Sequence, residues 1–156
     1  MKQVSLTQHV AMPPDDLWNH IGRFGAIRDW HPMLECVATV GEFPGSRRVA
    51  YTMNGDVQVE RLQQIDPQQR SYRYSVEQTS MPVDHYVGEL QVSPAGNGTS
   101  VINWSAEFNV EFGDTETAEN IRQFLAAGLR NIRSTYGDAA ATDRKAIGKR
   151  WKDLLS

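Results

Sequence analysis

The sequence predicts an α+β fold in which a curved, seven-stranded antiparallel sheet packs on one long C-terminal helix. Consecutive segments of alternating apolar and polar residues are joined by short turns, which is typical of an antiparallel meander. After Gly113 the apolar residues change to a helical period that continues to about Gly137. A helix with one apolar stripe must bury it, and the sheet is the only large partner available.

The N-terminal part predicts one strand followed by two helices. Residues 4–10 alternate between apolar and polar, which indicates a strand with one largely apolar face. The run Pro13-Pro14-Asp15-Asp16 predicts a helix start, because proline sets the φ angle of the first turn and aspartates suit its positive end. Gly22 ends this helix, and a short second helix is expected over residues 26–30, before Pro32.

Six further strands follow from the same alternation. They are expected over residues 34–40, 47–53, 57–65, 71–77, 83–92 and 100–110. Asn54-Gly55 is a strong hairpin signal between the second and third of these strands. In the strand over residues 83–92, Tyr86 and Gly88 share the expected inner face, and Trp104 lies inward on the last strand.

Residues 1–137 are therefore expected to form one domain, and residues 138–156 to form a basic C-terminal extension whose apolar spacing is typical of a helix. This extension has apolar residues at helical spacing among Arg144, Lys145, Lys149, Arg150 and Lys152. Two interpretations stay open. It is a tail packed locally, or it docks on another subunit to give a homodimer, on another partner, or on an anionic membrane.

Composition excludes several classes of function. The net charge of −3 argues against a dedicated nucleic-acid binder, and no apolar run is long enough for an integral membrane span. The single cysteine, Cys36, allows no intrachain disulfide and suits a cytoplasmic location. No lysine lies between residues 3 and 144, which excludes Schiff-base chemistry there. The scattered histidines and the absence of a nucleotide-binding fingerprint predict neither a metal nor another cofactor.

The order of elements carries a set of short motifs along its length. They are Leu17-Trp18, Trp30-His31-Pro32, Val59-Glu60-Arg61-Leu62, Trp104-Ser105-Ala106-Glu107-Phe108 and Gly128-Leu129. On this basis, residues 2–137 resemble the START/Bet v 1-like (SRPBCC) superfamily, and within it the bacterial polyketide cyclase/dehydrase-like group. The resemblance implies a helix-grip fold, in which the sheet curves around the long helix and a mainly apolar cavity lies between them.

Three side chains are candidates for polar or catalytic work in that cavity. Glu60 could bind a ligand hydroxyl or act as an acid or base, although Val57 and Val59 compete for the inner face of its strand. His31 is expected near the entrance, as a proton shuttle or as a surface histidine that caps the short helix. Tyr86 could donate a hydrogen bond to a ligand or belong to the core.

The function expected from the resemblance is binding of a small hydrophobic ligand of lipid, polyketide or aromatic type. The alternatives are a polyketide cyclase/dehydratase-type enzyme that uses cavity acid and base residues, and an interaction module without a fixed ligand. The expected ligand-binding residues are Trp30, His31, Glu60, Tyr74, Tyr86, Gly88, Trp104, Phe124, Leu125 and Gly128.

Overall fold

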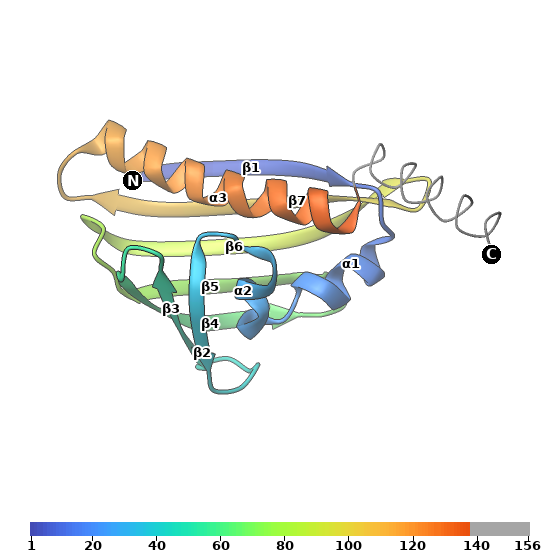
Figure 1. Cartoon of the computed structure of the whole chain (residues 1–156), viewed down its shortest axis with the longest axis horizontal. Helices are drawn as coiled ribbons and strands as arrows, with labels where there is room; N and C mark the ends of the chain where they lie inside the picture. The colour runs from blue at the N-terminus through green and yellow to red at the C-terminus, as the bar shows by residue number, and fades with distance from the viewer. Residues whose placement is uncertain (138–156) are drawn as a thin grey trace, which may run out of the picture.

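The computed structural model of the chain describes residues 1–137, which include every element of the expected α+β fold (Figure 1). The predictions for residues 138–156 lie outside the described residues. None of the helices within residues 1–137 combines the length and apolar character that a bilayer span requires.

The sheet has seven antiparallel strands in the order β1-β7-β6-β5-β4-β3-β2, as the sequence predicts. All neighbours except β1 and β7 are consecutive in the chain, so the sheet is a meander closed by the return of β7 to β1. The strands are β1 (Lys2–Val10), β2 (Leu34–Thr39), β3 (Arg47–Thr52), β4 (Val57–Asp66), β5 (Ser71–Gln78), β6 (Val83–Gly96) and β7 (Thr99–Val110).

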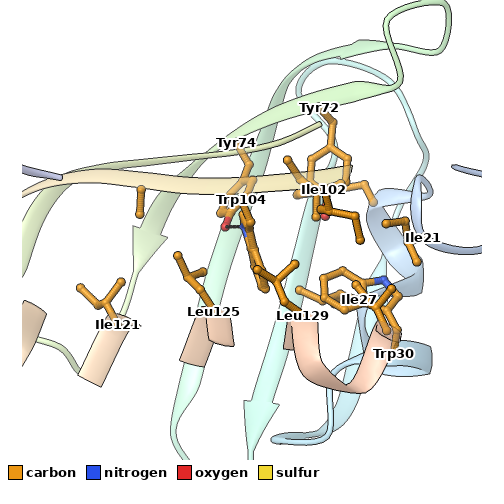
Figure 2. Packing of buried hydrophobic residues seen from close by; sticks show 14 of the residues in the cluster. Ile21, Ile27, Trp30, Tyr72, Tyr74, Ile102, Trp104, Ile121, Leu125 and Leu129 are labelled. Atoms are coloured by element: carbon orange, nitrogen blue, oxygen red, sulfur yellow. Dashed lines mark hydrogen bonds between the residues drawn. The ribbon is translucent and has the colours of Figure 1, made fainter. Parts of the chain in front are cut away.

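The long helix α3 (Asp114–Tyr136) follows β7 and runs back across the sheet above β1 and β7 (Figure 1). Its buried side is formed by residues at helical spacing, among them Ile121, Leu125, Leu129 and Ile132. Figure 2 shows Ile121, Leu125 and Leu129 pointing toward the strands. The stripe that the sequence predicts is therefore the surface by which the helix packs on the sheet.

Three short helical elements connect β1 to β2. They are α1 (Pro14–Ile21), the 3-10 helix η1 (Phe24–Ala26) and α2 (Ile27–Trp30). The expected second helix is thus divided, with a 3-10 turn before the α-helical one. The carboxylate of Glu42 accepts hydrogen bonds from the backbone N–H groups of Phe24 and Gly25, and Asn131 of α3 donates to the carbonyl of Trp30. These bonds fix the connection against the rest of the fold.

Aromatic side chains fill the core between α2, α3 and the middle of the sheet (Figure 2). Trp30 and Trp104 meet edge to face with ring centroids 5.3 Å apart, and the indole N–H of Trp104 donates to the Tyr74 hydroxyl at 3.1 Å. Tyr72 lies on the same face of β5 as Tyr74. This end of the interior is therefore occupied by protein side chains rather than by open space.

A β-bulge interrupts the regular alternation of β6. The register with β7 shifts between Asp84 and Val87, and His85 has a left-handed φ of 51°. Because of the extra residue, Val83 and Tyr86 both face the interior although they are three positions apart. The bulge therefore keeps Val83 on the same face as Tyr86 and Leu90, which follow the regular alternation.

Candidate functional site

A cavity of about 230 Å³ opens between the first half of α3 and the sheet. It lies at the end of the molecule where the β3–β4 turn and the β5–β6 connection meet the start of α3 (Figure 1). Its lining residues are Met33, Thr52, Asn54, Asp56, Val57, Gln58, Glu60, Tyr74, Thr79, Ser80, Met81, Tyr86, Asn120, Ile121 and Phe124. Most of the exposed wall is apolar, with polar groups at a few points.

Glu60 contributes a carboxylate to this cavity and forms a buried ion pair with Arg48. The two residues are opposite each other in the β3–β4 register, so both side chains lie on the same face of the sheet. Arg48 Nε lies 2.6 Å from Glu60 Oε1, and the Arg48 side chain has no exposed surface. A charge-assisted bond this deep in the protein holds the carboxylate in one position.

Arg48 is enclosed by aromatic rings and by one backbone carbonyl. Its guanidinium carbon lies 4.1 Å from the ring centroid of Phe24 and 4.9 Å from that of Tyr74. Nη1 donates to the carbonyl of Phe24 at 2.7 Å, whereas Nη2 has no hydrogen-bond partner within residues 1–137. Burial alone would lower the pKa of Arg48, but the charge of Glu60 and the smaller effects of Tyr72 and Tyr74 together outweigh it, and the pKa is raised.

The second oxygen of Glu60 is bound by its neighbour on the strand. Gln58 Nε2 donates to Glu60 Oε2 at 3.0 Å, and Thr79 donates to Gln58 Oε1 at 3.2 Å. A continuous set of hydrogen bonds therefore runs from the β5–β6 connection through Gln58 and Glu60 to Arg48. It fixes the polar groups on this side of the cavity.

Two tyrosine hydroxyls lie on the cavity wall with Glu60. The Tyr86 ring stacks on Phe108 with centroids 5.6 Å apart, and its hydroxyl has no hydrogen bond to any residue in the described part of the chain. The Tyr74 hydroxyl accepts from Trp104. Burial raises the pKa of both phenols, and the charge of Glu60 adds to the rise, so both remain neutral donors near pH 7.

His31 is buried beside the cavity without lining it. Its ring stacks on Phe124 at 4.0 Å between centroids. The backbone N–H of Met33 donates to Nδ1, so Nε2 carries the proton and donates to the carbonyl of Phe124 at 2.8 Å. Burial lowers the pKa of His31 to about 4. At neutral pH His31 is therefore an uncharged side chain with both nitrogens already bonded.

Four of the ten expected ligand-binding residues line the cavity, namely Glu60, Tyr74, Tyr86 and Phe124. The other six lie in the packed core around it: Trp30, His31, Gly88, Trp104, Leu125 and Gly128. A Cβ at Gly128 would come within 3.0 Å of His31, Trp30 and Trp104, and one at Gly88 would lie 2.2 Å from the Tyr74 ring. Both glycines make room for aromatic side chains. Ligand contact by any of the ten stays a prediction.

Sequence reasoning missed Arg48 and Gln58 as parts of the site. In β3 the apolar residues Val49 and Tyr51 suggest the inner face, yet Arg48 and Ala50 are the buried ones. The available signal was the pairing of β3 with β4 across the Asn54-Gly55 turn, which brings Arg48 opposite Glu60. No group of three or more His, Cys, Asp or Glu side chains within residues 1–137 is arranged to hold a metal ion.

Several solved structures are similar to this chain in fold. XoxI from Bacillus cereus is 25% identical, with a TM-score of 0.81 covering 87% of this chain and 96% of that chain. A Thermobifida fusca protein is 27% identical, with a TM-score of 0.75 over 87% of this chain and 93% of that one. Norcoclaurine synthase from Thalictrum flavum, solved with dopamine and hydroxybenzaldehyde, is 21% identical (TM-score 0.66, covering 85% and 84%) and shows the fold alone.

Comparison with the curated proteins found no match. The family model described as polyketide cyclase / dehydrase and lipid transport matches residues 1–137, the same residues that the structure describes. With its Bet v 1-like helix-grip fold, the chain is a member of this family.

Proposed function

We propose that the chain binds a small, mainly apolar molecule in the cavity between α3 and the sheet. The observation that carries this proposal is a preformed cavity with largely apolar walls, in which Glu60 and Tyr86 supply a few polar groups. Such a combination is typical of sites that bury most of a ligand and orient it by a small number of hydrogen bonds. The family match supports the same class of function.

The cavity volume limits the size of the ligand. An apolar cavity of about 150 Å³ binds benzene. By the same ratio, about 230 Å³ accepts roughly nine non-hydrogen atoms. A substituted single aromatic ring fits this space, whereas a long acyl chain or a sterol would need part of its body to extend outside.

Binding without catalysis is favoured because the three catalytic candidates, His31, Glu60 and Tyr86, do not all face the same position in the cavity. Both nitrogens of His31 are used by backbone groups, and His31 does not line the cavity. Glu60 is already paired with Arg48, so a proton transfer to its carboxylate would have to weaken a buried ion pair. Glu60 and Tyr86 remain as groups that orient a ligand.

Native mass spectrometry of the protein purified from its own host tests this proposal, followed by extraction of any molecule that copurifies. We expect one reproducible small, apolar compound. Met81→Trp enlarges a half-buried side chain in the cavity lining and should abolish its retention, whereas Phe112→Trp, at an exposed position outside the lining, should retain it. Equal retention by both variants, or no compound and no binding to any small aromatic, would contradict the proposal.

A cyclase or dehydratase is the second candidate. The observation that favours it is that Tyr74 and Tyr86 line the cavity together with Glu60, so two phenols could hold a substrate carbonyl near a carboxylate. Norcoclaurine synthase shows that a protein of this fold can be an enzyme. Release of a cyclised or dehydrated product from a short β-polyketide thioester, lost in Tyr86→Phe, would establish this activity.

A cytoplasmic location and a contact of residues 138–156 with a second subunit or another partner are also proposals. The single cysteine supports the first, and the basic, periodic sequence of the extension supports the second.

A further inference from the structure

We propose that the cavity selects an uncharged ligand that carries a hydroxyl group, and that it rejects carboxylates. The hydroxyl donates to Glu60 and accepts from Tyr86. This inference rests on the proposed ligand-binding function and adds the chemical class of the ligand. Three independent features support it: the charges that line the cavity, the hydrogen bonds left open on Glu60, and the unpartnered hydroxyl of Tyr86.

The cavity lining contains two carboxylates, Asp56 and Glu60, and no Lys, Arg or His among its described residues. Arg48 is the nearest cation to Glu60, but it has no exposed surface and is not part of the lining. The guanidinium of Arg48 is in contact with Glu60 and with the rings of Phe24 and Tyr74, which separate it from a ligand. An anionic ligand would therefore meet a carboxylate and lose its hydration without gaining a cation in return.

Glu60 can accept further hydrogen bonds but cannot donate any. Its ion pair with Arg48 uses one acceptor site of Oε1, and Gln58 uses one of Oε2. A carboxylate has about four such sites, so roughly two remain. The ligand group that meets Glu60 must consequently be a donor, which excludes ethers, ketones and carboxylates from this position.

Tyr86 supplies the complementary group. Its side chain is buried and lines the same cavity, yet its hydroxyl has no partner within residues 1–137. A hydroxyl that faces a largely apolar cavity without a protein partner is expected to bind a ligand or water. Glu60 and Tyr86 lie on β4 and β6, separated only by β5, and Tyr86 faces inward in regular alternation with Gly88 and Leu90.

A hydroxyl group fits both residues through a single oxygen atom. A hydroxyl can donate to Glu60 and at the same time accept from Tyr86. An ammonium has no acceptor for the Tyr86 proton, and it also gains less from a carboxylate whose charge Arg48 already compensates. A neutral alcohol or phenol satisfies both groups without bringing a charge into the cavity.

Four molecules with the same ethylphenyl body test this inference by isothermal titration calorimetry at pH 7: 4-ethylphenol, 4-ethyltoluene, 4-ethylbenzoate and 4-ethylbenzylamine. We expect the phenol to bind about 10- to 100-fold more tightly than the toluene, because it gains a hydrogen bond to a charged acceptor. The benzoate should bind more weakly than the toluene, and the ammonium should bind more weakly than the phenol.

Tyr86→Phe separates the hydrogen bond from the shape of the cavity. This substitution should weaken the binding of 4-ethylphenol by about 3- to 10-fold and leave the affinity for 4-ethyltoluene unchanged. Tyr136→Phe, at the opposite end of α3 from the lining residues, should change neither affinity. A substitution at Glu60 is avoided here because it would leave Arg48 buried without its counterion.

The outcomes distinguish this inference from the proposed function. If the phenol and the toluene bind equally, or if the benzoate or the ammonium binds most tightly, the cavity binds ligands but the hydroxyl preference is wrong. If none of the four molecules binds, both the proposed function of the cavity and the preference are wrong. A phenol preference that Tyr86→Phe leaves intact also overturns the inference.

Discussion

Removing either member of the Arg48–Glu60 pair should destabilise the protein far more than removing both. Arg48→Met leaves an uncompensated carboxylate, and Glu60→Leu leaves a guanidinium with no exposed surface and no other carboxylate bonded to it. Breaking a buried pair in this way costs about 3–5 kcal/mol. For a domain of this size that corresponds to a fall in Tm of roughly 8–16 °C.

The double variant should recover most of this loss. Replacing both charges by apolar residues is often neutral, because the cost of desolvating the two ions disappears with them. We therefore expect a coupling free energy of at least about 3 kcal/mol from a double-mutant cycle, measured by urea unfolding. The packing of Arg48 against Phe24 and Tyr74 favours methionine as its replacement, since methionine fills irregular apolar space.

The exposed ion pair made by the neighbouring Arg47 of β3 with Glu77 of β5 provides a matched control. Arg47 Nε lies 2.8 Å from Glu77 Oε2, but the two side chains are 58% and 30% exposed. Solvent screening limits such a pair to less than about 1 kcal/mol of coupling. A coupling for Arg48 and Glu60 that is no larger than that for Arg47 and Glu77 would refute the description of the former as a buried ion pair.

Three further outcomes follow from the core. Because burial lowers the pKa of His31 from 6.5 to about 4, the unfolded chain takes up a proton that the folded chain excludes. The free energy of unfolding should therefore fall by up to about 3 kcal/mol as the pH drops from about 6.5 to about 4. Urea unfolding at several pH values should show a smaller fall for His31→Gln than for the wild type, and an equal fall would contradict this explanation. Gly88→Ala forces a methyl group against the Tyr74 ring and should cost about 1–3 kcal/mol by thermal unfolding, whereas an unchanged Tm would mean that the ring yields freely. Tyr74→Phe leaves the indole N–H of Trp104 without its acceptor and should cost about 1–3 kcal/mol, compared with less than about 0.5 kcal/mol for the exposed Tyr51→Phe; equal costs would show that this hydrogen bond does not contribute.

The arrangement of strands and of α3 could be predicted because each of these elements has a recognisable pattern within its own segment of the sequence. Alternation over residues 100–110 and the helical period after Gly113 are local patterns, and burial of their apolar sides follows directly. The division of residues 24–30 into η1 and α2 was not predictable in the same way. It depends on Glu42 and Asn131, which reach the connection from other parts of the fold.

The polar centre of the site could be predicted only in part. Leu62 lies on the same side of β4 as Glu60, so its apolar character predicted that Glu60 faces inward. Val57 and Val59 predicted the opposite, because they lie on the other side of the strand. On β3 the apolar side faces outward and Arg48 faces inward. Taken alone, β3 therefore presents Arg48 as if it were exposed, and β4 leaves the direction of Glu60 open. The ion pair between Arg48 and Glu60 becomes evident only when β3 and β4 are paired, because their register places the two residues opposite each other.

The bulge in β6 marks a point at which the strand can change length without changing what the cavity presents to a ligand. Deleting His85 would place Val83 and Tyr86 two positions apart, and regular alternation would then still turn both side chains inward. A residue deleted between Tyr86 and Leu90 would instead put these two side chains on opposite faces of the sheet. Among proteins that share this fold, a one-residue difference at the bulge is therefore expected to leave ligand preference unchanged, whereas one further along β6 is a direct way for it to change.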